Sequence, residues 1–191
     1  MLTKEQILDA AEAVLRKYGP RKTTVVDVAR ALDVSHGTVY RHFATKAALH
    51  EAITSRWVER VTAPLDEIAS KPASPARRLR EWFETLMEIK QHKVHDDPEM
   101  FESYSLLAQK VPDHVVFAHL EVMISQVSRI LQDGVEQGLF DVTDCDATAR
   151  SLFDATLRYH HPLHVKEWNS PHIREEFDAL FTLLERAIEK H

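Results

Sequence analysis

The sequence predicts an all-α protein of about nine helices. Apolar residues recur at helical spacing along nearly all of the 191 residues, capping residues precede many of these segments, and no segment alternates as a strand would. With only four glycines, the chain has few positions suited to tight turns. Apolar residues make up 44% of the chain and charged residues 28%, which is typical of a globular protein.

The first fifty residues predict a three-helix domain. A helix is expected over residues 3–18, with a Thr3–Gln6 capping box at its start and Gly19 at its end. Two short helices are expected at 24–31 and 35–41, joined by a turn at 32–34. Two short helices joined by such a turn form the helix-turn-helix that reads DNA, in which 35–41 would be the recognition helix.

The remaining helices follow from caps and prolines. Thr45 is expected to cap a helix that runs to about residue 70, with Pro64 kinking it or ending it early. Proline suits the first helical position, so Ser74-Pro75, Asp97-Pro98 and Ser170-Pro171 each indicate a helix start. Three later helices are expected at residues 112–137, 144–162 and 171–189.

Charge divides the chain into the same two parts. Residues 1–50 hold eight Lys and Arg against five acids, a net charge of +3, whereas residues 51–191 carry −9. Such an asymmetry indicates that the basic part meets a polyanion. We therefore expect a DNA-binding domain over 1–50 and a larger helical ligand-binding and dimerisation domain over 51–191.

No membrane segment or secretion signal is expected. No apolar run approaches the ~20 residues that a spanning helix needs, and the N-terminus lacks the apolar stretch of a signal peptide. The single cysteine, Cys145, cannot form an internal disulfide. These features favour a cytoplasmic location.

The segment VSHGTVYRHF, residues 34–43, contains no acid. We expect Val39 and Phe43 to face the core and Ser35 to cap the helix, while Gly37 lets the backbone approach DNA closely. The side chains able to donate hydrogen bonds to phosphate oxygens are those of Thr38, Tyr40 and His42. Lys46 lies in the first turn of the next helix, where a cation opposes the helix dipole, and a nearby phosphate would explain it.

The stretch TTVVDVARALDVSHGTVYRHFATKAALHEAI, residues 23–53, resembles the DNA-binding domain of the tetracycline repressor family. The resemblance covers about residues 3–55, and the rest of the chain matches the family only in architecture. It implies a homodimeric, all-helical repressor that binds a palindromic double-stranded DNA operator and is released by a small molecule in the C-terminal domain.

The resemblance also implies roles for single residues. Thr24, Tyr40, His42 and Lys46 match the family's phosphate contacts, and Ser35, His36, Thr38 and Arg41 occupy positions that can face base edges. Arg41 is the strongest candidate for bidentate recognition of guanine.

A sensing domain needs a pocket with apolar walls and a few polar groups. By spacing, Trp82, Phe83, Leu86 and Met87 are not expected to share one core stripe, so some of them would line a cavity. The residues predicted to bind the small-molecule effector are Trp82, Phe83, Met87, Phe101, Tyr104, Phe117, Met123, Phe153 and His160.

Histidines in two segments suggest a transition-metal site. His160 and His164 stand four residues apart in RYHHPLHVKEW, and His92, His95 and Asp96 lie close together in KQHKVHDDPE. Together they would suit Zn²⁺ or Ni²⁺, and the protein would then be a metal-responsive regulator. Against this, Pro162 interrupts the first segment, and the alternatives are a histidine that polarises an organic ligand or a structural surface role.

Three classes of function were weighed. The first is a ligand-responsive repressor, which by the resemblance would dimerise through helices 144–162 and 171–189. The second, a metal-dependent helical enzyme, lacks an H-E-x-x-H motif, paired carboxylates and a nucleophile motif, so we expect no enzymatic activity. The third is an architectural DNA binder, but residues 56–191 exceed what a dimerisation element requires.

Overall fold

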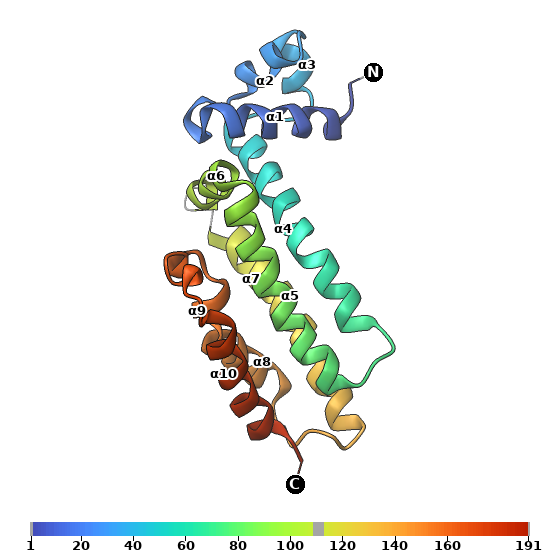
Figure 1. Ribbon diagram of the computed structural model, residues 1–191. Coiled ribbons are helices and arrows are strands. Elements are labelled where there is room, and N and C mark those ends of the chain that lie inside the picture. The colour runs from blue at the N-terminus through green and yellow to red at the C-terminus, as the bar shows by residue number, and fades with distance from the viewer. Residues whose placement is uncertain (1, 109–112, 191) are drawn as a thin grey trace. The chain divides into compact units, whose positions relative to one another are not determined.

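The computed structural model describes residues 2–108 and 113–190, and in this part of the chain it is all-α, as predicted (Figure 1). The described residues form ten α-helices and three short 3-10 helices. The α-helices are α1 Lys4–Tyr18, α2 Val25–Ala31, α3 His36–Tyr40, α4 Lys46–Ser70, α5 Pro75–Asp96, α6 Pro98–Ala108, α7 Asp113–Glu136, α8 Cys145–Ala155, α9 Leu157–His160 and α10 Ile173–Ile188.

The chain folds into two compact units. Unit 1 comprises Met1–Arg60 and Asp96–Ala118, and unit 2 comprises Val61–His95 and His119–His191. Residues 96–118 thus belong with the N-terminal part of the chain. The boundary at residue 50 between two functional domains stays a prediction.

In unit 1, α1 lies across the α2–α3 pair (Figure 1). The capping boxes of α1 and α2, at Thr3–Gln6 and Thr24–Asp27, fix where these helices begin. One apolar core joins α1, α2, α3, α6 and the first turns of α4. Its most deeply buried members are Ile7, Ala11, Leu15, Val28, Ala29, Val39, Leu49 and Ile53.

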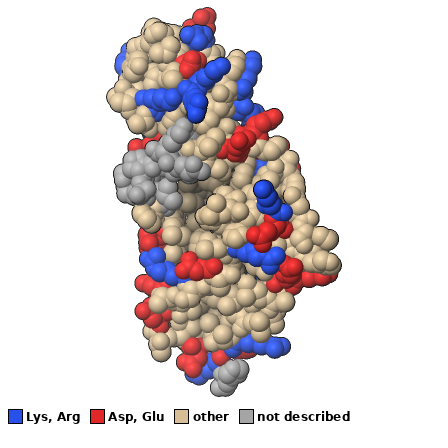
Figure 2. Space-filling view, turned by 90° about the vertical axis from the view of Figure 1, so that its left-hand side faces the viewer, with Lys and Arg blue, Asp and Glu red and all other residues tan. Residues whose placement is uncertain are grey.

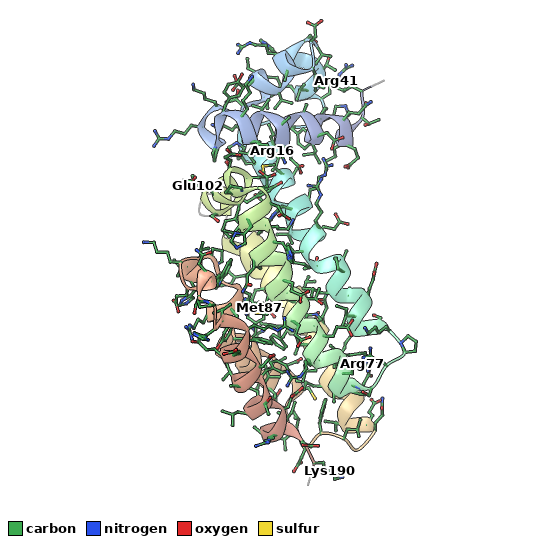
Figure 3. The ribbon with its side chains drawn as sticks, viewed as in Figure 1. Arg16, Arg41, Arg77, Met87, Glu102 and Lys190 are labelled. Atoms are coloured by element: carbon green, nitrogen blue, oxygen red, sulfur yellow. The ribbon has the colours of Figure 1, made fainter. Side chains whose placement is uncertain are left out.

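Helix α6 is attached to α1 and α4 within unit 1. The Arg16 guanidinium on α1 binds the Asp97 carboxylate, with Nη2 and Oδ2 2.5 Å apart. The Trp57 ring stacks on the Tyr104 ring with centroids 5.0 Å apart. In the view of Figure 3, Glu102 of α6 and Arg41 lie on opposite sides of α1. The polar face around Arg41 is therefore not covered by α6.

In unit 2, α5, α7, α8 and α10 run lengthwise beside one another (Figure 1). Its fully buried aromatic side chains are Trp82, Phe83, Phe177 and Phe181. The Trp82 indole donates to Gln126 Oε1 at 3.1 Å, and the Gln126 amide donates to the Thr62 carbonyl at 3.2 Å. This chain of hydrogen bonds joins α4, α5 and α7 through their buried faces.

Pro64 was expected to kink the fourth helix or to end it early. The early end is wrong, because α4 continues through this residue to Ser70. Proline has no N–H, so the Arg60 carbonyl four residues earlier loses its usual donor. Buried residues on both sides of the proline, Val61 and Leu65, keep the helix packed.

Two predicted helix boundaries in the C-terminal region are also wrong. The helix expected over 144–162 is divided into α8 and α9 at Thr156, whose buried hydroxyl donates to the Leu152 and Phe153 carbonyls. Back-bonding of this kind weakens a helix slightly and often bends it. The last helix begins at Ile173 instead of Pro171, because the Ser170 hydroxyl accepts from the His172 N–H in a local turn.

Within the described residues, every helix is too short or too polar to cross a membrane.

Candidate functional site

The helix predicted at 35–41 is present as α3, His36–Tyr40, and is anchored by apolar side chains. Its role as the recognition helix stays a prediction. Val39 is fully buried and Phe43 is 3% exposed, as expected from their spacing. The turn before α3 is closed by the Val34 N–H, which donates to the Ala29 carbonyl at 3.0 Å, and Asp33 adopts a φ of 53°. Because this positive φ is uncommon outside glycine and Asn or Asp, an aspartate suits the position.

Most polar side chains of α3, and those of the two residues that follow it, are exposed. His36, Arg41 and His42 are all exposed, and Tyr40 is 46% exposed. Figure 3 shows Arg41 at the outer side of unit 1. A helix with one apolar edge in the core and a row of exposed donors is suited to lying in a DNA groove.

Ser35 lies at the N-cap position of α3, but the prediction that its side chain caps the helix is wrong. Its hydroxyl instead shares a hydrogen bond with the Thr38 hydroxyl, with the oxygens 2.9 Å apart. A Cβ added at Gly37 would meet a single atom within 4 Å, Ser35 Oγ at 3.9 Å. Packing within the protein therefore does not require glycine there, and the close approach of its backbone to DNA stays a prediction.

Thr24 and Lys46 both have partners within unit 1. Thr24 is the N-cap of α2, and its hydroxyl accepts from the Asp27 N–H at 3.2 Å. Lys46 is exposed, and its ammonium donates to the Arg21 carbonyl at 3.0 Å. This contact stabilises a cation in the first turn of α4. The unfavourable position of Lys46 relative to the helix dipole therefore does not by itself require a phosphate there.

Basic side chains gather on the N-terminal part of the surface that Figure 2 shows, whereas acidic and basic groups are interspersed on the C-terminal part. This agrees with the charge division in the sequence, +3 for residues 1–50 and −9 afterwards. A local positive field attracts the phosphate backbone even in a protein with a net charge of −6.

The nine residues predicted to bind a small molecule are divided between the units. Phe101, Tyr104 and Phe117 belong to unit 1, and Phe117 is 61% exposed. The other six are buried in unit 2: Trp82, Phe83, Met87, Met123, Phe153 and His160. Burial, and to a smaller degree the Glu12 carboxylate, raise the pKa of Tyr104.

Trp82, Phe83, Leu86 and Met87, which were not expected to share one core stripe, are all at most 2% exposed. That some of them line a cavity stays a prediction. Helix α5 has neighbours on two sides. The Trp82 indole bonds to Gln126 of α7, and the Phe83 ring lies 5.3 Å from the Phe181 ring of α10. A helix covered on two sides buries a wider face than one stripe.

The histidines proposed as metal ligands make separate contacts. His164 Nδ1 lies 2.6 Å from Glu167 Oε1, and His92 Nδ1 lies 2.8 Å from the Glu88 carbonyl. His95 and Asp96 are exposed. Among the described residues, no three His, Cys, Asp or Glu side chains come together in a group that could hold a metal ion.

His160 is instead part of the interior of unit 2. It is 4% exposed, its ring centroid lies 4.6 Å from that of Phe153, and Nε2 lies 3.2 Å from the Thr156 hydroxyl. Burial, and then the charge of Lys90, lower the pKa of His160 to about 3. At neutral pH His160 is an uncharged polar group inside an apolar environment.

Sequence analysis missed two further polar groups in this interior, Lys90 and His119. Lys90 is 7% exposed, and the two ring nitrogens of His119 are buried. A signal was present: Lys90 follows Leu86 and Met87 on the buried stripe of α5, and His119 precedes the buried Met123 by one turn. Polar residues at apolar positions of a helix indicate a functional role.

Acid should destabilise the protein through His160. The His160 pKa falls from 6.5 in the unfolded chain to about 3 in the folded protein, so between these values only the unfolded chain takes up the proton. Stability therefore falls as the pH drops below 6.5, by roughly 1.4 kcal/mol per pH unit. Between pH 7 and pH 5 we expect the His160→Gln variant to lose about 2 kcal/mol less than the wild type in urea unfolding. Parallel losses in the two proteins would contradict the assignment.

Comparison with known proteins identifies both parts of the chain. The family model "Bacterial regulatory proteins, tetR family" matches residues 7–53, and "Tetracyclin repressor-like, C-terminal domain" matches residues 75–181. These are transcriptional regulators, and the expectation that the chain is not an enzyme is confirmed by this family assignment.

Individual relatives agree with the family models. The HTH-type transcriptional repressor KstR2 of Mycobacterium tuberculosis is 26% identical over 165 residues, which cover 82% of this chain and 80% of the relative. The uncharacterised regulator YhgD of Bacillus subtilis is 24% identical over 189 residues, covering 98% and 95%. The structure of SmeT, the repressor of the Stenotrophomonas maltophilia multidrug efflux pump SmeDEF, superimposes with a TM-score of 0.72 at 19% identity, covering 100% and 92%, and shows the same fold. With one family model spanning more than half of its length and a second covering the helix-turn-helix, the chain belongs to the tetracycline repressor family of DNA-binding regulators.

Proposed function

We propose that the protein is a homodimeric transcriptional repressor that binds a palindromic operator and is released by a small molecule bound in its C-terminal region. The observation that carries this proposal is the exposed, acid-free face of α3. Repressors are among its relatives, KstR2 by sequence and SmeT by fold, and SmeT has been crystallised with triclosan.

The outer faces of α8 and α10 support a dimer. Apolar residues that are exposed or half-buried recur along α10 at Leu180, Leu183 and Leu184, with Leu183 63% exposed. On α8 the small residues Ala147, Ser151 and Ala155 are exposed at intervals of four, which permits close helix approach. A C2 dimer would bury both stripes and set the two recognition helices about 34–36 Å apart, one turn of DNA.

Release would use α4. This helix is continuous from Lys46 to Ser70, so its first turns pack under the helix-turn-helix and its last turns belong to unit 2. A ligand that favours a different position of α4 would change the separation of the recognition helices. Because such coupling is reciprocal, the operator must weaken ligand binding by the same factor.

Two substitutions test the DNA-binding face. Tyr40→Ala is expected to weaken binding about equally for all sequences, because a phosphate contact carries no sequence information. Arg41→Ala is expected to lower affinity for the selected operator by roughly 10- to 100-fold and to relax sequence choice at one base pair, because a bidentate base contact is lost. The measurement is selection of bound sequences from a random pool, followed by titration of operator and scrambled DNA at fixed salt.

Arg77→Ala is a suitable control, since Arg77 is an exposed arginine of unit 2 and lies outside the proposed DNA-binding face. Unchanged operator affinity in both the Tyr40 and Arg41 variants would refute the assignment of α3 as the recognition helix. If the protein binds operator as a dimer but no compound releases it, the architectural alternative would replace the ligand-responsive one.

A further inference from the structure

Three helices of unit 2 bring basic groups into its interior. Lys90 of α5 is 7% exposed, and His160 of α9 is 4% exposed. His119, on α7, is partly buried. The Gln91 amide, next to Lys90, donates to the Tyr159 carbonyl, next to His160, at 3.4 Å, which places the two helices side by side at this level.

His119 has unmet hydrogen-bonding capacity. Neither Nδ1 nor Nε2 has a hydrogen-bond partner among the described residues, although both atoms are buried. A neutral imidazole offers one donor and one acceptor, and buried polar groups in native proteins nearly always have partners. A bound molecule with a polar group at this place would supply the missing partner.

The electrostatics favour an anion. Burial, and then the charge of Lys93, lower the pKa of Lys90 to about 8, so that its ammonium is still charged at neutral pH. Burial, and then the charge of Lys90, lower the pKa of His119 to about 4. Burial, and then the charge of Lys90, lower the pKa of His160; burial, then His164 and then Lys90, lower the pKa of His161. An anion near Lys90 would stabilise the cation and the proton on each of these bases.

Two of these bases, Lys90 and His160, have apolar neighbours. Met87 is 2% exposed and precedes Lys90 by one turn on the same face of α5; Figure 3 shows it midway along that helix. The Phe153 ring lies 4.6 Å from the His160 ring. A ligand that satisfies both environments has an anionic group joined to an apolar body.

We propose that unit 2 binds an amphipathic acid, a small molecule with a carboxylate or phosphate ester on an apolar body, whose anionic group is held by the Lys90 ammonium and the His119 imidazole. This inference rests on the proposed function, because it names the chemical class of the effector. His160, already bonded to Thr156, borders the anionic group and positions it.

Nonanoate, octyl phosphate and octanol are suitable probes, because each carries the same octyl chain and they differ in the polar group. We expect isothermal titration of the full chain to show at least one of the two anions binding at least about tenfold more tightly than octanol, the difference of one charge-assisted contact. The preferred anion identifies whether the effector is a carboxylate or a phosphate ester.

Variants locate the anionic group. Lys90→Met and His119→Phe are each expected to lower the affinity for the preferred anion about tenfold or more and to leave the affinity for octanol nearly unchanged. Lys90→Arg, which keeps the charge, should retain preference for the anion. Lys190→Met removes an exposed lysine near the C-terminus and serves as the matched control (Figure 3). Thermal unfolding of each variant identifies any that have lost the fold.

The proposal is overturned if the anions and the alcohol bind with equal affinity, or if none of the three compounds binds. It is also overturned if the anion affinity persists in both Lys90→Met and His119→Phe. Operator titration in parallel separates it from the proposed function. Operator binding without anion binding refutes this site and leaves the DNA-binding function intact. Lys90-dependent anion binding that does not release the operator supports the site and refutes its role in release.

Discussion

Replacing Trp82 by alanine is expected to lower the free energy of unfolding by about 4–8 kcal/mol. Removing a buried aromatic side chain typically costs about 3–5 kcal/mol through lost transfer energy and the cavity left behind. The Trp82 side chain is fully buried, and its indole N–H is bonded to Gln126 Oε1. The variant therefore also leaves a buried acceptor without its donor, which costs roughly 1–3 kcal/mol more.

Two further variants separate packing from hydrogen bonding. Trp82→Phe keeps much of the ring packing but removes the N–H, so we expect a smaller loss, about 2–3 kcal/mol. Adding Gln126→Leu to Trp82→Phe removes the unpaired amide oxygen, but it also removes the donor to the Thr62 carbonyl, so we expect only partial recovery. Urea unfolding followed by circular dichroism gives these values, and a loss below about 2 kcal/mol for Trp82→Ala would contradict the role of this chain of bonds.

Local sequence rules predicted where most helices begin because caps act within a few residues. The Thr3–Gln6 box and the Ser74-Pro75 and Asp97-Pro98 starts depend only on neighbouring backbone groups, and each stands where it was expected. The division at Thr156 was missed because its hydroxyl bonds to carbonyls three and four residues earlier are no distinctive signal: Thr54 and Thr182 bond to the carbonyl four residues earlier inside unbroken helices.

Packing between helices was harder to predict than the helices themselves. A single stripe of apolar residues is typical of a helix that packs against a core on one side only. Helix α5 instead contacts both α7, through Trp82, and α10, through Phe83. Residues too widely spread for one stripe are thus all buried, because α5 is covered on two sides. The grouping of 96–118 with unit 1 likewise depends on distant contacts, such as that between Arg16 and Asp97.

The candidate DNA-binding face was the more predictable site because it is continuous in sequence. Val39 and Phe43 are buried and Tyr40 and Arg41 are exposed, as helical spacing requires. The interior bases were less accessible to such reasoning, because Lys90, His119 and His160 lie on three helices and are far apart in the chain. From the sequence, the histidine pairs were interpreted as metal ligands because of their spacing. In the structure His160 lies against Phe153 and Thr156, and His164 has a carboxylate partner.

Replacing Lys90 by methionine is expected to stabilise the unliganded protein by up to about 3 kcal/mol at pH 7. The Lys90 pKa is 10.5 in the unfolded chain and about 8 in the folded protein, and each unit corresponds to roughly 1.4 kcal/mol. At pH 7 the ammonium is charged in both states, so the folded state bears the whole cost of burying it. Methionine has a similar length and no charge, and it suits a position that follows Met87 on the same buried face.

The pH dependence gives this prediction its sharpest test. Between pH 8 and pH 10.5 the folded protein releases the Lys90 proton before the unfolded chain does, so wild-type stability should rise with pH relative to the variant. The difference in unfolding free energy between Lys90→Met and the wild type should therefore be smaller at pH 10 than at pH 7. The unfolding free energy of Lys190→Met should stay within about 0.5 kcal/mol of the wild type at both pH values. A variant that is less stable than the wild type at pH 7 would show that the contacts of Lys90 outweigh its desolvation. A variant that is more stable but has lost anion binding would show that Lys90 serves recognition at a cost in folding stability. An interior selected for stability alone would not keep a charge at this position.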